Sequence, residues 1–140
     1  MHTDLEKAKA YLQAGGCTCV LCRGEDIYSS SHRGVRPLLD FLDSGRDFTG
    51  LSAADKVVGK ATAFLYCLLG VRQVHAQVLS DAAVEVLTRR GIACSCDRQV
   101  SAIRNRDNTG PCPMEYATRD IADPTPALTA IRFALQKLQS

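Results

Sequence analysis

The sequence predicts a three-layer α/β/α fold in which a mixed sheet of about four strands lies between two layers of helices. Strand-like segments at residues 73–79 and 92–96 flank a helical segment, and a helical crossover joins parallel strands. Two further segments, residues 17–22 and 26–31, are separated only by a short turn with a glycine. That spacing is typical of an antiparallel hairpin, which makes the sheet a mixed one.

The first elements of the chain have local end signals. Thr3 and Glu6 form the pattern of a capping box, and a Gly-Gly pair would end the helix that they begin. After the hairpin, residues 36–43 predict a short helix.

The next helix is expected to be the most apolar one. Ser52 would cap it, with Asp55 three residues later, and the apolar segment continues to Gly70. A helix that is hydrophobic on nearly every side is expected to be buried against a sheet. Gly59 within this helix costs roughly 1 kcal/mol relative to alanine. It is therefore expected to serve close packing or the close approach of a ligand.

The second half of the chain contains similar signals for the ends of its helices. Ser80 would cap a helix over residues 81–90, whose terminal charges suit the helix dipole. After the following strand and a polar stretch, a helix is predicted to begin near Cys112. Asp123 and Pro124 would start the last helix, as cap and first helical residue.

Composition narrows the class of protein. The 140 residues suit one compact domain, and we expect a single domain over residues 1–140. With 46% hydrophobic and 23% charged residues, the chain is not expected to be wholly disordered. A net charge of +2 gives no strong nucleic-acid signal. No apolar run approaches the ~20 residues that cross a bilayer, and no signal-peptide core follows the N-terminus, so a cytoplasmic protein is expected. Composition leaves a homo-oligomer open.

Seven cysteines, an odd number without a secretory signal, argue against a closed disulfide framework. Cys19 and Cys22 form the one CxxC pair, but residues three apart in a strand point to opposite faces, so they should not converge. Cys17 and Cys19 should share a face, as should Cys94 and Cys96. We interpret most of these cysteines as small buried hydrophobic residues, with metal or cluster binding as the alternative.

Ligands of open α/β sheets bind at the carboxyl ends of strands, beside helix N-termini. Asp55, Lys56 and Lys60 are expected in such a segment, and two lysines four residues apart on a helix share a face. A buried lysine is costly without a partner, so both are candidate ligand-binding groups. The alternative is that both extend to solvent from the helix start.

The most informative segment is NRDNTGPCPME, residues 105–115, in which one glycine and two prolines fix a polar loop. Cys112 would lie at a helix N-terminus, where the dipole and unpaired N–H groups favour a thiolate, so it is the candidate nucleophile. The alternatives are that Glu115 only caps that helix and that Cys112 is an inert loop residue. The other candidates in this segment are Asn105, Arg106, Asp107 and Thr109.

Zinc-deaminase motifs are matched only in part. Gln77, two residues after His75, cannot act as the acid or base, and Glu115 stands where a second cysteine should follow Cys112. A strand histidine that faces the sheet surface is the simpler interpretation of His75. No metal site and no cofactor are predicted, and P-loop, GxGxxG and GxSxG motifs are missing from the sequence.

The segments ADKVVGKATAFLYCLLGV and NRDNTGPCPME resemble the two signature stretches of a prokaryotic family of unknown function, and the likeness extends from about Leu21 to about Pro126. That family resembles cytidine deaminases in fold but lacks their zinc ligands. In that fold the ligands come from the starts of the second and third core helices, which here hold residues 52–55 and 80–81. The resemblance therefore implies a cytidine-deaminase-like architecture and a site position, without a reaction. Sulfur-transferring accessory proteins of formate dehydrogenase have a similar fold and use cysteine.

These observations predict a polar pocket for a small anionic or nucleotide-like ligand. Cys112 would be nucleophile or sulfur carrier, Asp107 or Glu115 an acid or base, and Lys60 a further catalytic group. The ligand-binding candidates are Asp55, Lys56, Gly59, Asn105, Arg106 and Thr109. The alternatives are a non-catalytic ligand-binding or regulatory module, and a metal or redox protein that uses Cys17, Cys19, Cys94 and Cys96.

Overall fold

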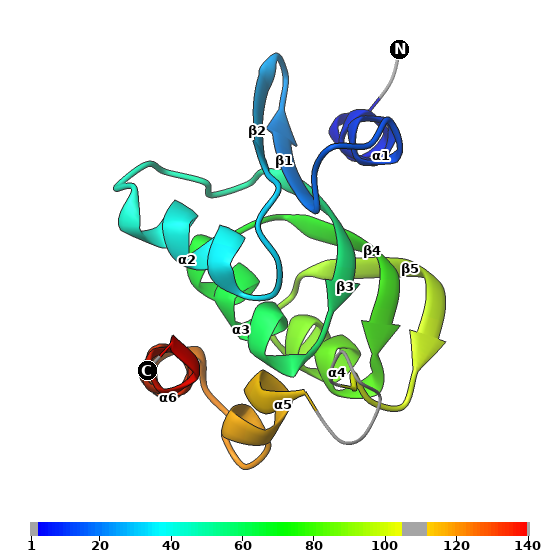
Figure 1. Ribbon diagram of the computed structural model, residues 1–140. Coiled ribbons are helices and arrows are strands. Elements are labelled where there is room, and N and C mark those ends of the chain that lie inside the picture. The colour runs from blue at the N-terminus through cyan, green and yellow to red at the C-terminus, as the bar shows by residue number, and fades with distance from the viewer. Residues whose placement is uncertain (1–2, 105–111, 140) are drawn as a thin grey trace.

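The structure is a computed structural model that describes residues 3–104 and 112–139 (Figure 1). Within these residues the chain forms six helices and five strands. The helices are α1 (Asp4–Gln13), α2 (Arg36–Asp43), α3 (Lys60–Leu69), α4 (Asp81–Arg89), α5 (Pro113–Thr118) and α6 (Pro124–Gln139). The strands are β1 (Cys19–Arg23), β2 (Asp26–Ser30), β3 (Ser52–Val58), β4 (Gln73–Ser80) and β5 (Ala93–Val100).

The strands form one mixed sheet in the order β2-β1-β3-β4-β5. β1 is antiparallel to both β2 and β3, which confirms the predicted hairpin. β3, β4 and β5 are parallel, and α3 and α4 provide the crossovers between them. The predicted parallel pair is therefore confirmed, and β3 adds a third parallel strand beside an antiparallel neighbour.

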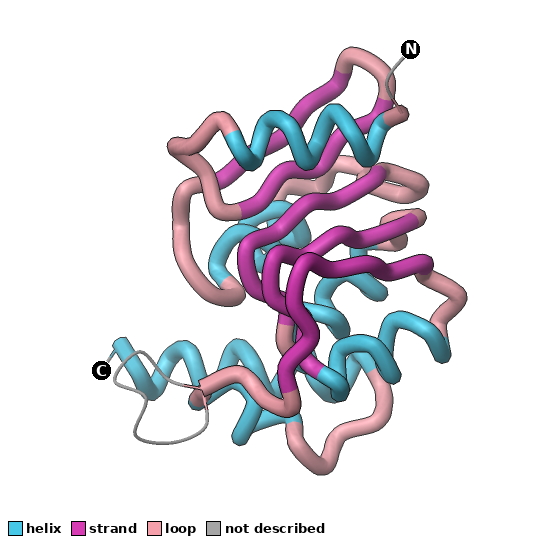
Figure 2. The backbone as a smooth tube through the Cα atoms, turned by 90° about the vertical axis from the view of Figure 1, so that its right-hand side faces the viewer, coloured by secondary structure: helices cyan, strands magenta, loops and turns pink. Residues whose placement is uncertain are grey.

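Helices cover both faces of the sheet, as the three-layer prediction requires. α1 lies across one face, in front of β1 and β3 (Figure 2). Its buried residues Ala8 and Leu12 pack there against Val20, Cys22 and Ala54. The opposite face packs against α2, α3 and α4, and α6 packs against α3 and α5, to the lower left of α3 in Figure 1.

The predicted helix from Ser52 to Gly70 was wrong in its first half. Ser52–Val58 is strand β3, so the sheet has five strands instead of four. A strand buried on both faces is a continuous apolar run, and over seven residues such a run cannot be distinguished from a buried helix by its periodicity. Ala53 and Ala54 have good helix propensity, but both are fully buried between neighbouring strands. Gly59 separates the strand from α3 and is the N-cap residue of that helix.

Several local end signals were confirmed. Thr3 and Glu6 make both bonds of the capping box, and Ser80 Oγ accepts a hydrogen bond from the backbone N–H of Ala83 at the start of α4. α5 begins directly after Cys112, with Pro113 as its first residue.

The cysteines, all of which lie among the described residues, have free thiols. Cys19 and Cys22 lie on opposite faces of the sheet, and Cys94 with Cys96 packs against the larger core, as predicted. The prediction that Cys17 and Cys19 share a face was wrong. Cys17 precedes the first residue of β1 and packs under α1, outside the alternation of the strand.

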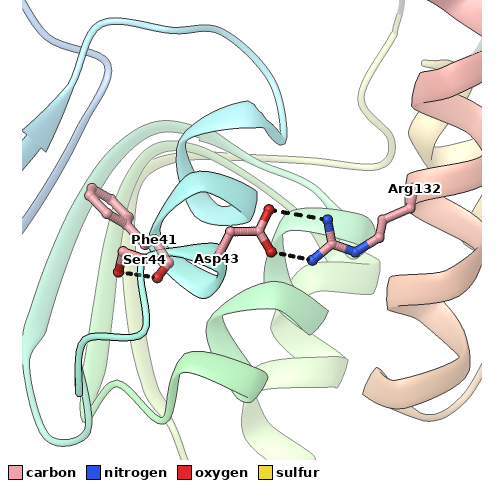
Figure 3. Close-up of polar contacts among 4 residues, drawn as sticks. All are labelled: Phe41, Asp43, Ser44 and Arg132. Atoms are coloured by element: carbon pink, nitrogen blue, oxygen red, sulfur yellow. Dashed lines mark hydrogen bonds and ion pairs between the residues drawn. The ribbon is translucent and has the colours of Figure 1, made fainter.

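Distant helices are tied together on the side of the sheet away from α1. Arg132 of α6 donates two hydrogen bonds to the carboxylate of Asp43 at the end of α2, at 2.8 and 3.3 Å (Figure 3). In the same region Ser44 Oγ donates to the carbonyl of Phe41 at 2.6 Å, which closes the last turn of α2. None of the helices in the described part of the chain is long and apolar enough to cross a membrane.

Candidate functional site

A cavity of about 410 Å³ lies where β3 ends and α3 begins, and we call it the Asp55 cavity. The turn from β3 into α3 lies beside α5 (Figure 1). The cavity is thus at the carboxyl end of a parallel strand, where ligands of α/β sheets bind. It is lined by Thr18, Arg33, Gly34, Val35, Pro37, Asp55, Lys56, Val57, Gly59, Ala61, Thr62, Ile103, Cys112, Met114 and Glu115.

Asp55 is a buried carboxylate, and its hydrogen-bond partners among the described residues are neutral. Tyr66 donates its hydroxyl proton to Asp55 Oδ2 at 2.7 Å, and the backbone N–H of Val57 donates to Oδ1 at 3.3 Å. Among the described residues no cation forms an ion pair with it. Burial raises the pKa of Asp55 to about 6, although these hydrogen bonds favour the ionised form.

A third buried group extends this network. Cys19 Sγ lies 3.2 Å from the hydroxyl oxygen of Tyr66. The single hydroxyl proton of Tyr66 is directed to Asp55, so the Cys19 thiol is the donor of this contact. Burial raises the pKa of both Cys19 and Tyr66 well above their ordinary values. Both therefore stay protonated, and any negative charge in the network lies on Asp55.

Glu115 holds the N-terminus of α3 instead of capping its own helix. Its Oε1 accepts a hydrogen bond from the backbone N–H of Lys60 at 2.6 Å, and the backbone N–H of Ala61 contributes as well. Burial raises the pKa of the Glu115 carboxyl, and these bonds oppose that rise. A Cβ on Gly59 would lie 1.7 Å from Oε1, so the close approach requires glycine at this position.

The two candidate lysines do not share a face, because the segment that holds them is not one helix. Lys56 is an exposed residue of β3 that lines the Asp55 cavity. The backbone of Lys60 contacts Glu115, but its side chain leads to a second cavity and donates to the carbonyl of Arg119 at 2.8 Å. Lys60 Nζ is therefore not among the groups that line the Asp55 cavity.

Cys112 lines the Asp55 cavity from the start of α5. It is partly buried, and its backbone N–H donates to the carbonyl of Ile103 at 3.1 Å. The structure thus brings Cys112 into one cavity with Asp55, Lys56, Gly59 and Glu115. Four other predicted site residues lie outside the described residues: Asn105, Arg106, Asp107 and Thr109.

Sequence reasoning missed Tyr66 and Arg33. Tyr66 lies within an apolar helix, and a buried tyrosine hydroxyl usually needs a polar partner, so this signal could have been used. Arg33 precedes α2 in a polar loop and has no comparable signal in the sequence.

No group of three His, Cys, Asp or Glu side chains that could hold a metal ion occurs in the part of the chain that the structure describes. His75 lies in β4 and is 6% exposed. Its ring nitrogens lie 2.7 Å from Ser95 Oγ and 3.1 Å from Asp97 Oδ1, as expected of a strand histidine with satisfied hydrogen bonds.

Comparison with known proteins places the chain among domains without an established function. The crystal structure of a DUF1893 family protein from Thermotoga maritima superposes with a TM-score of 0.80 at 24% identity and covers 98% of this chain and 92% of its own. A dCMP deaminase from the cyanophage S-TIM5, in its apo form, gives a TM-score of 0.48 at 12% identity over 66% of this chain and 92% of its own. No curated protein sequence matches the chain. The family model described as domain of unknown function (DUF1893) matches residues 7–134, and the chain therefore belongs to that family.

Proposed function

We propose that the chain binds a small nucleotide-like ligand in the Asp55 cavity. The ligand would present N–H donors of a nitrogen heterocycle to Asp55 and an anionic group to the basic side chains of Arg33 and Lys56. A volume of about 410 Å³ lies in the ordinary range of small-molecule sites.

The observation that carries this proposal is the state of Asp55. A buried carboxylate without a cation pays a desolvation penalty that its neutral partners offset only in part, which is why burial raises its pKa to about 6. A ligand N–H that donates to this carboxylate would stabilise the ionised form. Binding would then lower the pKa of Asp55 and release a proton near neutral pH.

The rest of the lining suits the same class of ligand. Val35, Ile103 and Met114 offer apolar contacts for the faces of a planar ring. Arg33 lines the cavity on the loop before α2, and a guanidinium is suited to a phosphate or carboxylate. The exposed Lys56 adds positive charge at the same end of β3.

The test compares three nucleoside monophosphates by calorimetric titration. Guanosine and cytidine monophosphates carry an exocyclic amino donor on the base edge. The uridine compound offers only its ring N3–H, which lies between two carbonyl oxygens that a carboxylate repels. We expect the first two to bind more tightly, and to bind about tenfold more weakly at pH 5 than at pH 7.5, because Asp55 is mostly protonated at pH 5. Asp55→Asn should abolish the preference and leave only the pH dependence that arises from the second ionisation of the phosphate, whose pKa is about 6. Equal binding of all three compounds, or none, would refute the proposal.

Cys112 favours a catalytic form of the same proposal. Its thiol and the Asp55 carboxyl line one cavity, and a group with a pKa of about 6 can exchange protons near neutral pH. In this form the Cys112 sulfur adds to a C=N carbon of the bound heterocycle while its S–H proton passes to Asp55. The C–S bond forms as the C=N π bond breaks, and the nitrogen that receives the electron pair takes the proton back from Asp55. Without that chemistry, the same lining serves a binding or regulatory module.

A further inference from the structure

The second cavity, which we call the Lys60 cavity, has a volume of about 600 Å³ and lies between the start of α3, the outer side of α4 and the residues that link α5 to α6. None of its lining residues also lines the Asp55 cavity. Four basic side chains surround it: Lys60, Arg89, Arg90 and Arg119.

We propose that the Lys60 cavity binds a multiply charged anion of the phosphate or pyrophosphate class. Such a ligand would bind independently of any ligand in the Asp55 cavity, so this proposal does not rest on the proposed function.

Lys60 is the central cation of this cavity. Its ammonium carries three N–H donors, and one of them meets the carbonyl of Arg119 at 2.8 Å. No carboxylate among the described residues forms an ion pair with it. The side chain lies over the ring of the buried Phe64, 5.8 Å from its centre, which keeps the ammonium at the cavity wall.

The three arginines are paired, but only through one nitrogen each. Arg89 contacts Glu85 at 3.0 Å, Arg90 contacts Asp123 at 3.0 Å, and Arg119 contacts Asp120 through Nε at 3.4 Å. A guanidinium has five N–H donors, so each arginine keeps donors outside its pair. Exposed ion pairs of this kind are weak, so an exchange of partners costs little.

Two of the three carboxylates that pair with these arginines can turn toward solvent, which would leave their cations available to an anion. The side chain of Asp123 is 69% exposed against 43% for Arg90, and that of Asp120 is 90% exposed against 60% for Arg119. The acidic groups therefore lie nearer to solvent than their basic partners. An anion seated over the apolar wall of Phe64 and Val86 would meet the cations in a less polar environment than water, where their attraction is stronger.

The experiment is calorimetric titration of the intact chain with inorganic pyrophosphate at low salt. We expect Lys60→Met to weaken binding at least tenfold and Lys60→Arg to retain most of it. Lys9→Met removes the same charge from α1, and Arg33→Met removes a cation from the Asp55 cavity, so neither should change the affinity. Should Lys60→Met fail to fold, Arg90→Met is expected to give the same loss.

Three outcomes would overturn the proposal. The first is that pyrophosphate does not bind to the wild-type chain. The second is that binding is lost in Arg33→Met and kept in Lys60→Met, which would place the anion in the Asp55 cavity. The third is equal weakening in all variants, Lys9→Met included, which would indicate non-specific attraction. Because the proposed function is tested through Asp55→Asn with nucleotides, either proposal can fail alone.

Discussion

Replacing Gly59 by alanine is expected to expel the Glu115 carboxylate from the N-terminus of α3. The new Cβ would lie 1.7 Å from Oε1 and 2.8 Å from Cδ of Glu115, so the carboxylate must move. A hydrogen bond to a charged group contributes about 1.5–3 kcal/mol, and this one links Oε1 to the Lys60 N–H at 2.6 Å. The backbone at Gly59 has φ −101°, which alanine adopts without strain, so reduced unfolded-state entropy returns about 0.4–1 kcal/mol. The net loss should be roughly 1–2 kcal/mol.

The assay is urea unfolding of four chains: wild type, Gly59→Ala, Glu115→Ala and the double variant. Without the Glu115 side chain the severe overlap is gone, and Ile103 has to shift by only a few tenths of an ångström, so Gly59→Ala should cost little in that background. The coupling between the two changes should reach about 1 kcal/mol or more. Gly16→Ala is the control, because its cost arises from φ +84° in open space and should not depend on Glu115. An equal cost of Gly59→Ala in both backgrounds would refute this reasoning and point to Ile103, whose Cγ1 would be 3.0 Å from the new atom.

Three further predictions concern the charge of Asp55, the reactivity of Cys112 and the zinc content of the protein. The pKa of Asp55 rises from its ordinary 3.8 to about 6 on folding, so its contribution to stability falls as pH rises through this window, by roughly 3 kcal/mol in all. Asp55→Asn should flatten that part of the pH profile of unfolding, and unchanged slopes would contradict it. In limited alkylation with iodoacetamide, Cys112 should label first of the seven thiols. Three of the others are buried, burial raises the pKa of Cys67 to about 11, and Cys112 lines a cavity, whereas Cys94 and Cys96 lie in strand β5 outside it. Labelling only after unfolding would remove its role as nucleophile. Protein purified without chelator should carry no stoichiometric zinc, since the described residues offer no three-ligand group, and one zinc per chain by elemental analysis would contradict this.

The elements that the sequence predicts well are those whose ends are fixed by neighbours in the chain. Thr3 and Ser80 accept bonds from N–H groups three residues later, so the start of each helix can be read locally. β3 was missed because its stability comes from hydrogen bonds to β1 and β4, which lie far away in the chain. The alanines and the lysine of β3 have no preference for strand, and tertiary pairing overrides their helix propensity.

In the candidate site, too, residues with local sequence signals were predicted, and contacts between distant segments were not. Asp55, Gly59, Cys112 and Glu115 were predicted from two local segments, and the structure brings these four residues to one cavity. The sequence spacing of Asp55 and Tyr66 does not indicate their contact. Asp55 lies in β3 and Tyr66 in α3, and only the turn between these two elements brings their side chains together.

The two carboxylates of the cavity have different tasks, although the sequence presents them alike. Glu115 already accepts backbone N–H groups of α3, and any proton transfer through it would weaken the contact that joins α5 to α3. Its burial thus serves the architecture. Asp55 is also buried, but its pKa of about 6 is suited to proton exchange at neutral pH, and a change in its charge does not break a contact between helices. A role in ligand binding or proton transfer therefore falls to Asp55 and not to Glu115.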